Sequence, residues 1–323
     1  MIPRSLRLSV MTFLTATFTC VCYAAPLLVV SEVHLVRGIF APGSQPDGNS
    51  VILDAPDGLI VVDTGRHAAH TQQLLDFAHD SGRPITAVIN THWHLDHVGG
   101  NLLIKEKFPD AKVYATDALT GAMTGFLAGY KKQLEEMLAN PATDAAARKN
   151  FENELDLIRA GKKLGPDVVI TKPGATTISE RKLYFGFERN AVTAGDLWVR
   201  DEKTGVLIAG DLVTLPAPFL DTACPARWKD TLERLQETKF DILVPGHGAP
   251  MTRTQFATYR AAFADFLACG TSNASKSRCV DAWVQTLQPM LTDDDPAFSK
   301  SVLEYYVDVL KRDPAKIREL CGN

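Results

Sequence analysis

The sequence has little excess charge of either sign. Its 323 residues include 34 Lys and Arg against 38 Asp and Glu, a formal net charge of -4 at pH 7. Proteins that bind nucleic acids neutralise phosphates with clustered Lys and Arg. The balanced composition therefore excludes nucleic acid as an expected partner, and the 46% hydrophobic content is typical of a globular protein.

Long apolar runs are also missing, with one exception near the N-terminus. Arg4 and Arg7 form a short basic start, and the apolar run from Leu8 to Val21 is interrupted by threonines. A membrane-spanning helix needs about 20 consecutive apolar residues, so the run favours a secretory signal over a membrane anchor. The small residue Ala24 fits a cleavage site. We expect residues 1–24 to be a signal peptide and the mature protein to be exported, periplasmic or secreted, with no stable membrane anchor.

Cysteine is scarce, and two of the six cysteines, Cys20 and Cys22, fall in the expected signal peptide. An even number remains, which is compatible with two disulfides in an oxidising compartment. The remaining four are Cys224, Cys269, Cys279 and Cys321. The first choice of pair is Cys269 with Cys279, because they bracket a short polar loop; Cys224 with Cys321 would then attach the tail to the core. Four free thiols are the alternative.

Internal repeats, low-complexity tracts and linkers are absent, which favours one α/β domain. Residues 27–89 contain short β segments, with the turn sequence of a hairpin at Ala55–Gly58. A helix is expected at about 67–79 and a buried strand at 87–89. Strand signals return in the second half and alternate with a helix at about 226–238.

Two stretches have the composition of helices throughout. Residues 117–163 are rich in Ala, Leu, Glu and Lys, with Pro141 as the expected break, and predict a helical insertion. Residues 251–323 predict a helical C-terminal extension, which leaves 25–250 as the main domain. Aromatic side chains of the insertion such as Phe126 either overhang a binding pocket or pack against the core.

A dense group of metal-ligand side chains follows the strand at 87–89. His92, His94, Asp96 and His97 fall within six positions. Buried imidazoles and carboxylates are costly without partners, so packing explains the group poorly. Neutral imidazole and carboxylate oxygen are standard donors to zinc and other first-row divalent metals, and the string therefore predicts a metal site on a loop.

Taken with two later strings, this pattern resembles the metallo-β-lactamase superfamily. His92-x-His94-x-Asp96-His97 is preceded by Asp63-Thr64-Gly65 and followed by Ala209-Gly210-Asp211-Leu212 and Pro245-Gly246-His247-Gly248, in the family's order, over about residues 27 to 250. The resemblance implies an α/β fold, a four-layer αβ/βα sandwich. It also implies two metal positions: His92 and His94 at the first, Asp96, His97 and His247 at the second, and Asp211 as a bridge.

One position departs from the pattern that the resemblance implies. Val192 stands where a further histidine of the first metal position is expected, and valine cannot donate to a metal. Three arrangements stay open: one zinc ion at the second position, which is favoured; two zinc ions, with another donor completing the first position; or a decayed catalyst that still binds metal. The candidates for another donor are His67, His70, Glu188 and Asn190.

The resemblance implies a zinc-dependent hydrolase that acts on a small-molecule substrate. Zinc lowers the pKa of bound water to about 7, which supplies a nucleophile at neutral pH. Asp96 is the expected catalytic residue, because it would both hold the ion and direct the nucleophile. The bond is an ester, lactone, amide or related bond. Two alternatives are an iron-dependent sulfur oxidoreductase and a non-catalytic, metal-binding periplasmic accessory protein.

Overall fold

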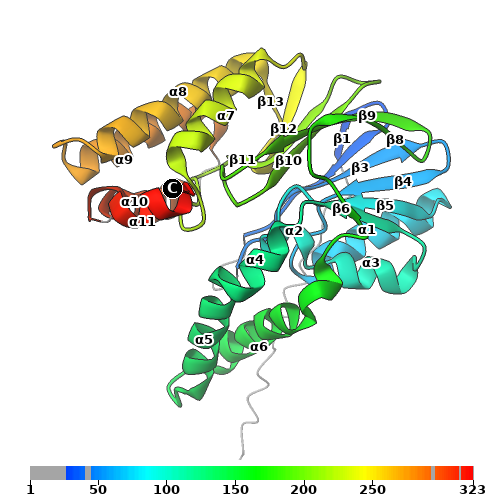
Figure 1. Cartoon of the computed structure of the whole chain (residues 1–323), viewed down its shortest axis with the longest axis horizontal. Coiled ribbons are helices and arrows are strands. Elements are labelled where there is room, and N and C mark those ends of the chain that lie inside the picture. The colour runs from blue at the N-terminus through cyan, green and yellow to red at the C-terminus, as the bar shows by residue number, and fades with distance from the viewer. Residues whose placement is uncertain (1–26, 41–44, 292–294, 313, 323) are drawn as a thin grey trace, which may run out of the picture.

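The computed structural model describes residues 27–322 apart from 41–44, 292–294 and 313. The expected signal peptide, with Cys20 and Cys22, lies outside the described residues. Two β-sheets pack face to face, and helices cover the outer side of each sheet (Figure 1). This arrangement confirms the four-layer αβ/βα sandwich.

The first sheet has seven strands in sequence order. They are β1 (Leu27–Val30), β2 (Val33–Val36), β3 (Ser50–Ala55), β4 (Gly58–Val62), β5 (Ile85–Ile89), β6 (Lys112–Ala115) and β7 (Val168–Val169). The first four are antiparallel, and β3 and β4 form the predicted hairpin. From β4 onward the pairing is parallel, because helices such as α1 (Ala68–Ser81) and α3 (Asn101–Lys107) return the chain to the same end of the sheet.

The second sheet has six strands, in the order β13-β12-β11-β10-β9-β8. They are β8 (Gly174–Ile178), β9 (Arg181–Glu188), β10 (Asp196–Asp201), β11 (Leu207–Thr214), β12 (Ile242–His247) and β13 (Met251–Thr252). Strands β11 and β12 are parallel and are joined by helix α7 (Pro225–Glu237). Both sheets therefore have parallel strands whose carboxyl ends can meet at one edge.

The core between the sheets follows from strand alternation. Successive side chains of a strand point to opposite faces. Ile60 and Val62 of β4 therefore pack inward against Phe185 of β9 and Ile208 of β11. The intervening Val61 faces the other way, into the cluster under helix α1.

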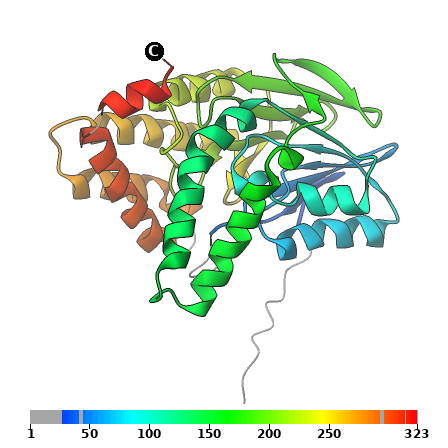
Figure 2. The ribbon, with the colours of Figure 1, turned by 60° about the horizontal axis from the view of Figure 1, so that its bottom comes forward.

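The predicted helical insertion forms a hairpin that projects from the sandwich (Figures 1 and 2). Its helices are α4 (Ala118–Thr124), α5 (Phe126–Ala139) and α6 (Ala145–Ala160), followed by the short 3-10 helix η1 (Gly161–Leu164). Pro141 lies between α5 and α6, at the predicted break. The base of the hairpin packs on Trp93 and Leu95 of the metal-ligand string, so the insertion adjoins the candidate site.

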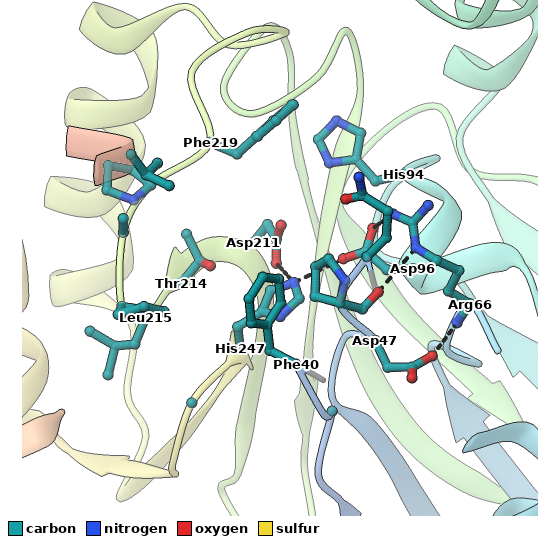
Figure 3. A pocket seen from close by; sticks show the side chains of 18 of the residues that line it. Phe40, Asp47, Arg66, His94, Asp96, Asp211, Thr214, Leu215, Phe219 and His247 are labelled. Atoms are coloured by element: carbon teal, nitrogen blue, oxygen red, sulfur yellow. Dashed lines mark hydrogen bonds and ion pairs between the residues drawn. The ribbon is translucent and has the colours of Figure 1, made fainter. Parts of the chain in front are cut away.

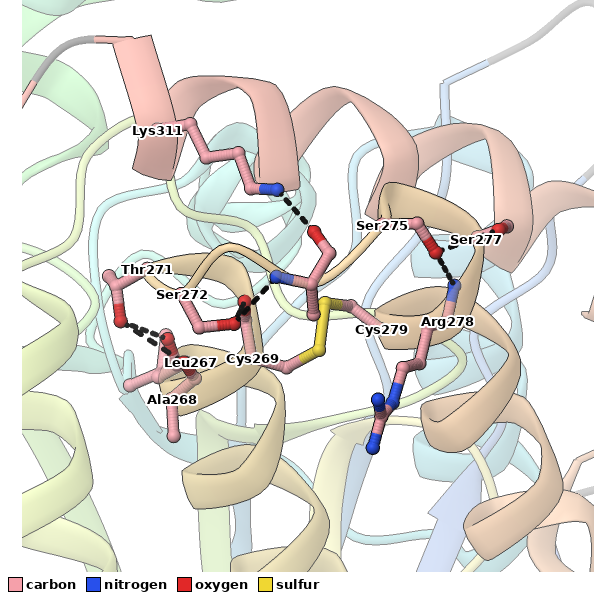
Figure 4. The surroundings of a disulfide bond; sticks show 11 residues. Leu267, Ala268, Cys269, Thr271, Ser272, Ser275, Ser277, Arg278, Cys279 and Lys311 are labelled. Atoms are coloured by element: carbon pink, nitrogen blue, oxygen red, sulfur yellow. Dashed lines mark hydrogen bonds between the residues drawn. A yellow bond between two sulfur atoms is a disulfide. The ribbon is translucent and has the colours of Figure 1, made fainter.

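The C-terminal extension is helical as predicted and packs against α7 and β13. Its elements are α8 (Arg253–Gly270), α9 (Lys276–Leu287), η2 (Gln288–Met290), α10 (Asp295–Arg312) and α11 (Pro314–Leu320). Both expected disulfides are present: Cys269–Cys279, which joins α8 to α9 (Figure 4), and Cys224–Cys321. Within the described ranges, no helix combines the length and apolar character needed to cross a bilayer.

Candidate metal centre

The six side chains assigned to metal binding come from the loop after β5 in the first sheet and from β11 and β12 in the second. His92 and His94 lie on the loop after β5, and the short helix α2 (Leu95–Val98) carries Asp96 and His97. Asp211 lies within β11 and His247 ends β12. The two sheets pack face to face with the loop after β5 next to the end of β12, and this brings together residues more than 150 positions apart.

The six side chains form two groups of three. His92, His94 and Asp211 make up the first group, and Asp96, His97 and His247 the second; within each group the candidate ligand atoms lie within 4.8 Å of one another. These are the two sets that the resemblance implies, with Asp211 placed in the first.

Asp211 lies between the two groups. One carboxylate oxygen, Oδ2, is 3.7 Å from Nε2 of His92. The other, Oδ1, is 3.3 Å from Nε2 of His97 and 3.5 Å from Nε2 of His247. Glycine at position 246 makes this placement possible, because a Cβ there would lie 2.0 Å from Oδ1 of Asp211. The geometry suits a carboxylate that bridges two cations.

Several of these atoms are buried without a hydrogen-bond partner. They are Nε2 of His92, Nε2 of His97 and Oδ1 of Asp211, in side chains that are 2%, 0% and 5% exposed. A buried polar atom left unsatisfied costs about 1–3 kcal/mol. A metal ion held by these atoms would remove that cost, so the residues present fit a metal.

Asp63 and Thr91 fix the orientation of two of the histidines. The Asp63 carboxylate accepts hydrogen bonds from Nδ1 of His97 at 2.8 Å and from the Thr91 hydroxyl at 2.7 Å. Because Thr91 gives its proton to Asp63, its oxygen must accept from Nδ1 of His92, 3.0 Å away. Nε2 of each ring is therefore directed toward the cluster. Outer partners of this kind set tautomer and ring orientation in metal sites.

The loop that carries His247 is held by Asn49. The Asn49 side-chain amide donates to the carbonyl oxygens of Pro245 and Gly248, both at 2.9 Å. Asn49 lies just before β3, in the other sheet. A residue at the edge of the first sheet thus holds the loop that carries a ligand of the second.

The electrostatics of the first group favour neutral imidazoles. Burial lowers the pKa of His92 well below its ordinary value, with further lowering by His97 and His94. Burial likewise lowers the pKa of His94, to about 4. Both rings are therefore neutral at pH 7, the state in which imidazole binds metals.

The second group is dominated by carboxylates. Burial by itself raises the pKa of Asp96, but neighbouring cationic groups, His97 first among them, outweigh it and hold the pKa well below the usual range. Burial lowers the pKa of His97 and of His247, but the nearby carboxylates, led by Asp211, raise both above the ordinary value. Asp96 is thus ionised, while protons compete with a metal at these two histidines.

Arg66 and Glu154 are site residues that the sequence analysis missed. Arg66 Nη2 lies 3.4 Å from Oδ1 of Asp96, and Nη1 pairs closely with Glu154 of helix α6. The Tyr130 hydroxyl of α5 donates to the same Glu154 carboxylate at 3.3 Å. The helical insertion is therefore connected to a candidate metal ligand. Arg66 directly follows the Asp63-Thr64-Gly65 bend, and its position next to this motif is the feature of the sequence that could have identified it as a site residue.

A cavity of about 1100 Å³ opens over the two groups. His94, Asp96, Asp211 and His247 line its floor, as Figure 3 shows. The walls are largely aromatic and aliphatic. They include Trp93 of the metal-ligand string, Phe126, Leu127 and Tyr130 of the insertion, Phe219 of the loop after β11, and Met290, Val302, Tyr305 and Tyr306 of the C-terminal extension. The insertion and the C-terminal extension therefore both shape the cavity.

The four candidates for a further donor do not belong to either group. Nδ1 of His67 pairs with Asp47 at 2.9 Å, and Nε2 of His70 pairs with the Ser50 hydroxyl at 2.8 Å. Glu188 instead accepts hydrogen bonds from Trp198, Thr231 and Arg234. Asn190 has a left-handed φ of 53° in the turn after β9.

The Val192 side chain is buried in the hydrophobic core. Its backbone carbonyl faces the site, where it accepts a hydrogen bond from the Thr222 hydroxyl at 2.9 Å. The same hydroxyl lies 2.9 Å from Nε2 of His94. The position expected to supply a ligand thus contacts the first group through its backbone and one intervening side chain.

Curated relatives of this chain are hydrolases. Over 223 residues it is 26% identical to the linear primary-alkylsulfatase of Pseudomonas sp. (strain ATCC 19151), a match that covers 62% of this chain and 41% of the relative. A shorter match, 41% identical over 54 residues, is to the hydroxyacylglutathione hydrolase of Synechococcus sp. (strain JA-3-3Ab), covering 17% of this chain and 21% of that protein. The chain thus spans less than half the length of either relative.

Solved structures share the fold at lower identity. The stereoselective inverting sec-alkylsulfatase Pisa1 from Pseudomonas sp. aligns with a TM-score of 0.61 at 18% identity, covering 91% of this chain and 51% of that one. A metallo-beta-lactamase from Pontibacter korlensis aligns with a TM-score of 0.55 at 19% identity, covering 74% of this chain and 98% of that one. The sequence profile of the metallo-beta-lactamase superfamily matches residues 44–247. The chain belongs to the metallo-beta-lactamase superfamily.

Proposed function

We propose that this protein is an exported, zinc-dependent hydrolase. The observation that carries the proposal is the convergence of six donor side chains, some with unsatisfied buried atoms, beneath a large cavity that four of them line. The hydrolases among the relatives support the reaction class. Two disulfides support export, since such bonds persist in oxidising compartments.

We propose one tightly held ion and one held more weakly. The second group offers Asp96, His97 and His247 together with the nearby Oδ1 of Asp211, which is a four-donor set. The first group offers two neutral imidazoles and a share of the same carboxylate. Because the Val192 side chain adds no donor, the first group binds more weakly.

The side chains that face the cavity have separate roles in the proposed hydrolysis. A bound metal ion supplies a Lewis acid and a water of lowered pKa. Asp96 is the catalytic residue: its Oδ2, 3.0 Å from Nε2 of His247, would join that histidine in holding the ion, and its Oδ1 is turned toward Arg66. Oδ1 would accept a hydrogen bond from the attacking water and orient it. His97, His247 and Arg66 together keep that carboxylate ionised.

The substrate class follows from the walls of the cavity. Aromatic and aliphatic side chains of two separate helical elements enclose space well beyond the ligand groups, which suits an apolar substituent. Likeness to an alkylsulfatase over 62% of the chain points the same way. We propose an ester with a compact anionic head, which sits at the ligand groups, and an alkyl or aryl tail along the walls.

The test is hydrolysis by zinc-replete, full-length protein. The panel contains alkyl sulfates of short and long chain, aryl sulfates and carboxylic esters, with nitrocefin to detect lactamase activity. We expect turnover that a chelator abolishes and zinc restores, with kcat/KM rising with chain length. Inactivity toward the whole panel in protein that carries zinc would contradict the proposal and favour an accessory role. Iron as the bound metal would favour the oxidoreductase alternative.

A matched pair of variants tests the role of Asp96. Asp96→Ala removes the proposed catalytic carboxylate, and we expect about a hundredfold or greater loss of kcat/KM. Asp110→Ala removes an exposed carboxylate in the turn before β6, outside both groups, and should leave activity unchanged. Equal activity in the two variants would contradict the role given to Asp96.

A further inference from the structure

The loop between β11 and α7, Leu215–Cys224, connects the metal groups with the C-terminal extension; we call it the site loop. At its start the Leu215 amide donates to the His247 carbonyl at 3.1 Å. In its middle Phe219 packs edge-on against the His94 ring, with centroids 5.3 Å apart. The loop therefore adjoins both candidate metal positions.

Thr222, on the site loop, determines which nitrogen of His94 carries the proton. Its hydroxyl has one proton, which it gives to the Val192 carbonyl, an obligatory acceptor. The contact between this hydroxyl and Nε2 of His94 at 2.9 Å then requires His94 to donate from Nε2. Nδ1 is left without a proton as the donor to a metal. Thr91 acts on His92 in the same manner, so a threonine sets the tautomer of each histidine in the first group.

The Val192 carbonyl, which accepts the hydrogen bond from Thr222, lies in a turn that the Asp196 carboxylate holds in place. The Asp196 carboxylate accepts hydrogen bonds from the Val192 and Thr193 amides, both at 3.0 Å, and from the Thr193 hydroxyl at 2.8 Å. The Val192 carbonyl therefore has a fixed direction. Although the Val192 side chain cannot bind metal, its backbone helps to organise a ligand that can.

The C-terminal extension contacts the site loop at three points. Nε1 of Trp283 in α9 donates to the Pro216 carbonyl at 2.8 Å. The hydroxyls of Tyr305 and Tyr306 in α10 donate to the Asp221 carboxylate at 3.0 and 3.3 Å. The third point is the Cys224–Cys321 disulfide, which joins the end of the loop to the tail. Two of the three points lie within two residues of Thr222.

We propose that the C-terminal extension is a positioning element of the first metal group. It holds Thr222 against His94 and Val192, and Thr222 sets the His94 tautomer that binds metal. This inference rests on the proposed metal-binding function. Thr222 is a positioning residue, because it acts through His94. Loss of such an outer partner typically weakens metal binding by about 10- to 100-fold.

The first test replaces the hydroxyl. Thr222→Val keeps the side-chain shape and removes the hydrogen bonds, whereas Thr222→Ser keeps the hydroxyl. Zinc titration of metal-free, full-length protein against a chromophoric chelator should show two binding steps in the wild type. In Thr222→Val the weaker step should weaken by about 10- to 100-fold and the tighter step should stay the same. Thr222→Ser should behave like the wild type.

A second readout needs no metal. Nitrogen NMR of the imidazoles in metal-free protein reports the tautomer of each histidine. We expect the Nε2–H form of His94 in the wild type and in Thr222→Ser, and a mixture with the Nδ1–H form in Thr222→Val. An Nδ1–H form in the wild type would overturn the inference.

The third test uses the two disulfides as a matched pair. The double variant Cys224→Ser, Cys321→Ser frees the end of the site loop, and we expect the weaker zinc step to weaken by about tenfold or more. The double variant Cys269→Ser, Cys279→Ser removes a disulfide that joins α8 to α9 and includes no residue of the site loop, and both zinc steps should be retained. Equal loss in the two variants would show general destabilisation and overturn the inference.

The outcomes separate this inference from the function on which it rests. A wild-type protein that binds no zinc defeats the proposed function and the inference together. A wild-type protein with a single zinc step leaves the hydrolase proposal standing and overturns the inference. The inference is also overturned if two steps are present and Thr222→Val leaves both unchanged.

Discussion

Replacing Arg66 with methionine should destabilise the protein strongly. Arg66 is 10% exposed and lies between two carboxylates, Glu154 and Asp96, that are 4% and 8% exposed. Burial lowers the pKa of Arg66, but Glu154 and then Asp96 raise it above its ordinary value, so the guanidinium stays charged. Methionine fills similar space without charge and leaves both carboxylates without this counter-charge.

The expected magnitude follows from the burial of this cluster. Removing one partner of a buried ion pair costs about 3–5 kcal/mol, because the remaining charge stays in a poorly solvated environment. With an unfolding entropy of about 2.1 cal/mol/K per residue over 323 residues, this cost corresponds to a fall in Tm of roughly 4–7 °C.

The assay is chemical and thermal unfolding of metal-free protein, with two controls. Lys131→Met removes an exposed i,i+4 pair with Glu135 and should cost about 0.5 kcal/mol or less. The double variant Arg66→Met, Glu154→Leu removes both charges of the closest pair and should recover at least half of the loss.

An Arg66→Met variant within about 1 kcal/mol of the wild type would refute this reasoning, since that is the effect of an exposed pair. A double variant less stable than Arg66→Met would refute it in another way. It would show that Glu154 stabilises the insertion without Arg66.

Three further predictions concern the site. Because the carboxylates raise the pKa of His97 and His247, these histidines must release protons when metal binds. Below those pKa values, zinc affinity should fall about tenfold per pH unit for each displaced proton. Calorimetry in buffers of different ionisation enthalpy should detect the released protons. Asp63→Asn should weaken the tighter zinc step by about 10- to 100-fold in chelator competition, because His97 loses its anionic partner; unchanged affinity would contradict that role. Phe126→Ala should raise KM for long-chain esters more than for short-chain esters, and an equal rise for both would count against the tail-binding wall.

Much of the fold and of the ligand set could be predicted from the sequence because those signals are local. The turn at Ala55–Gly58 sits between β-rich segments, and Pro141 interrupts a helical composition, so both boundaries agree with the structure. The ligand string is compact, and its resemblance to a family supplied the distant Asp211 and His247. The spacing of residues along the chain could not by itself have assigned Asp211 and His247 to the same site as the ligand string.

The parts that the sequence analysis missed depend on contacts between distant segments. The hydrogen bond between His94 and Thr222 spans 128 residues, and the pair of Arg66 with Glu154 spans 88. A threonine or a glutamate has no local pattern that marks it as a partner of a metal ligand. Strand β6 was missed because its four residues are too few to establish an alternating pattern in the sequence.

The most direct test of the central claim is the metal content of the full-length protein, purified without chelators and equilibrated with zinc. We predict between one and two zinc ions per chain in the wild type, and a clear fall in Asp211→Ala, whose carboxylate lies between the two groups. Asp110→Ala should match the wild type. Folded wild-type protein with no bound metal, or Asp211→Ala with undiminished zinc, would contradict the claim that these six side chains form a metal centre.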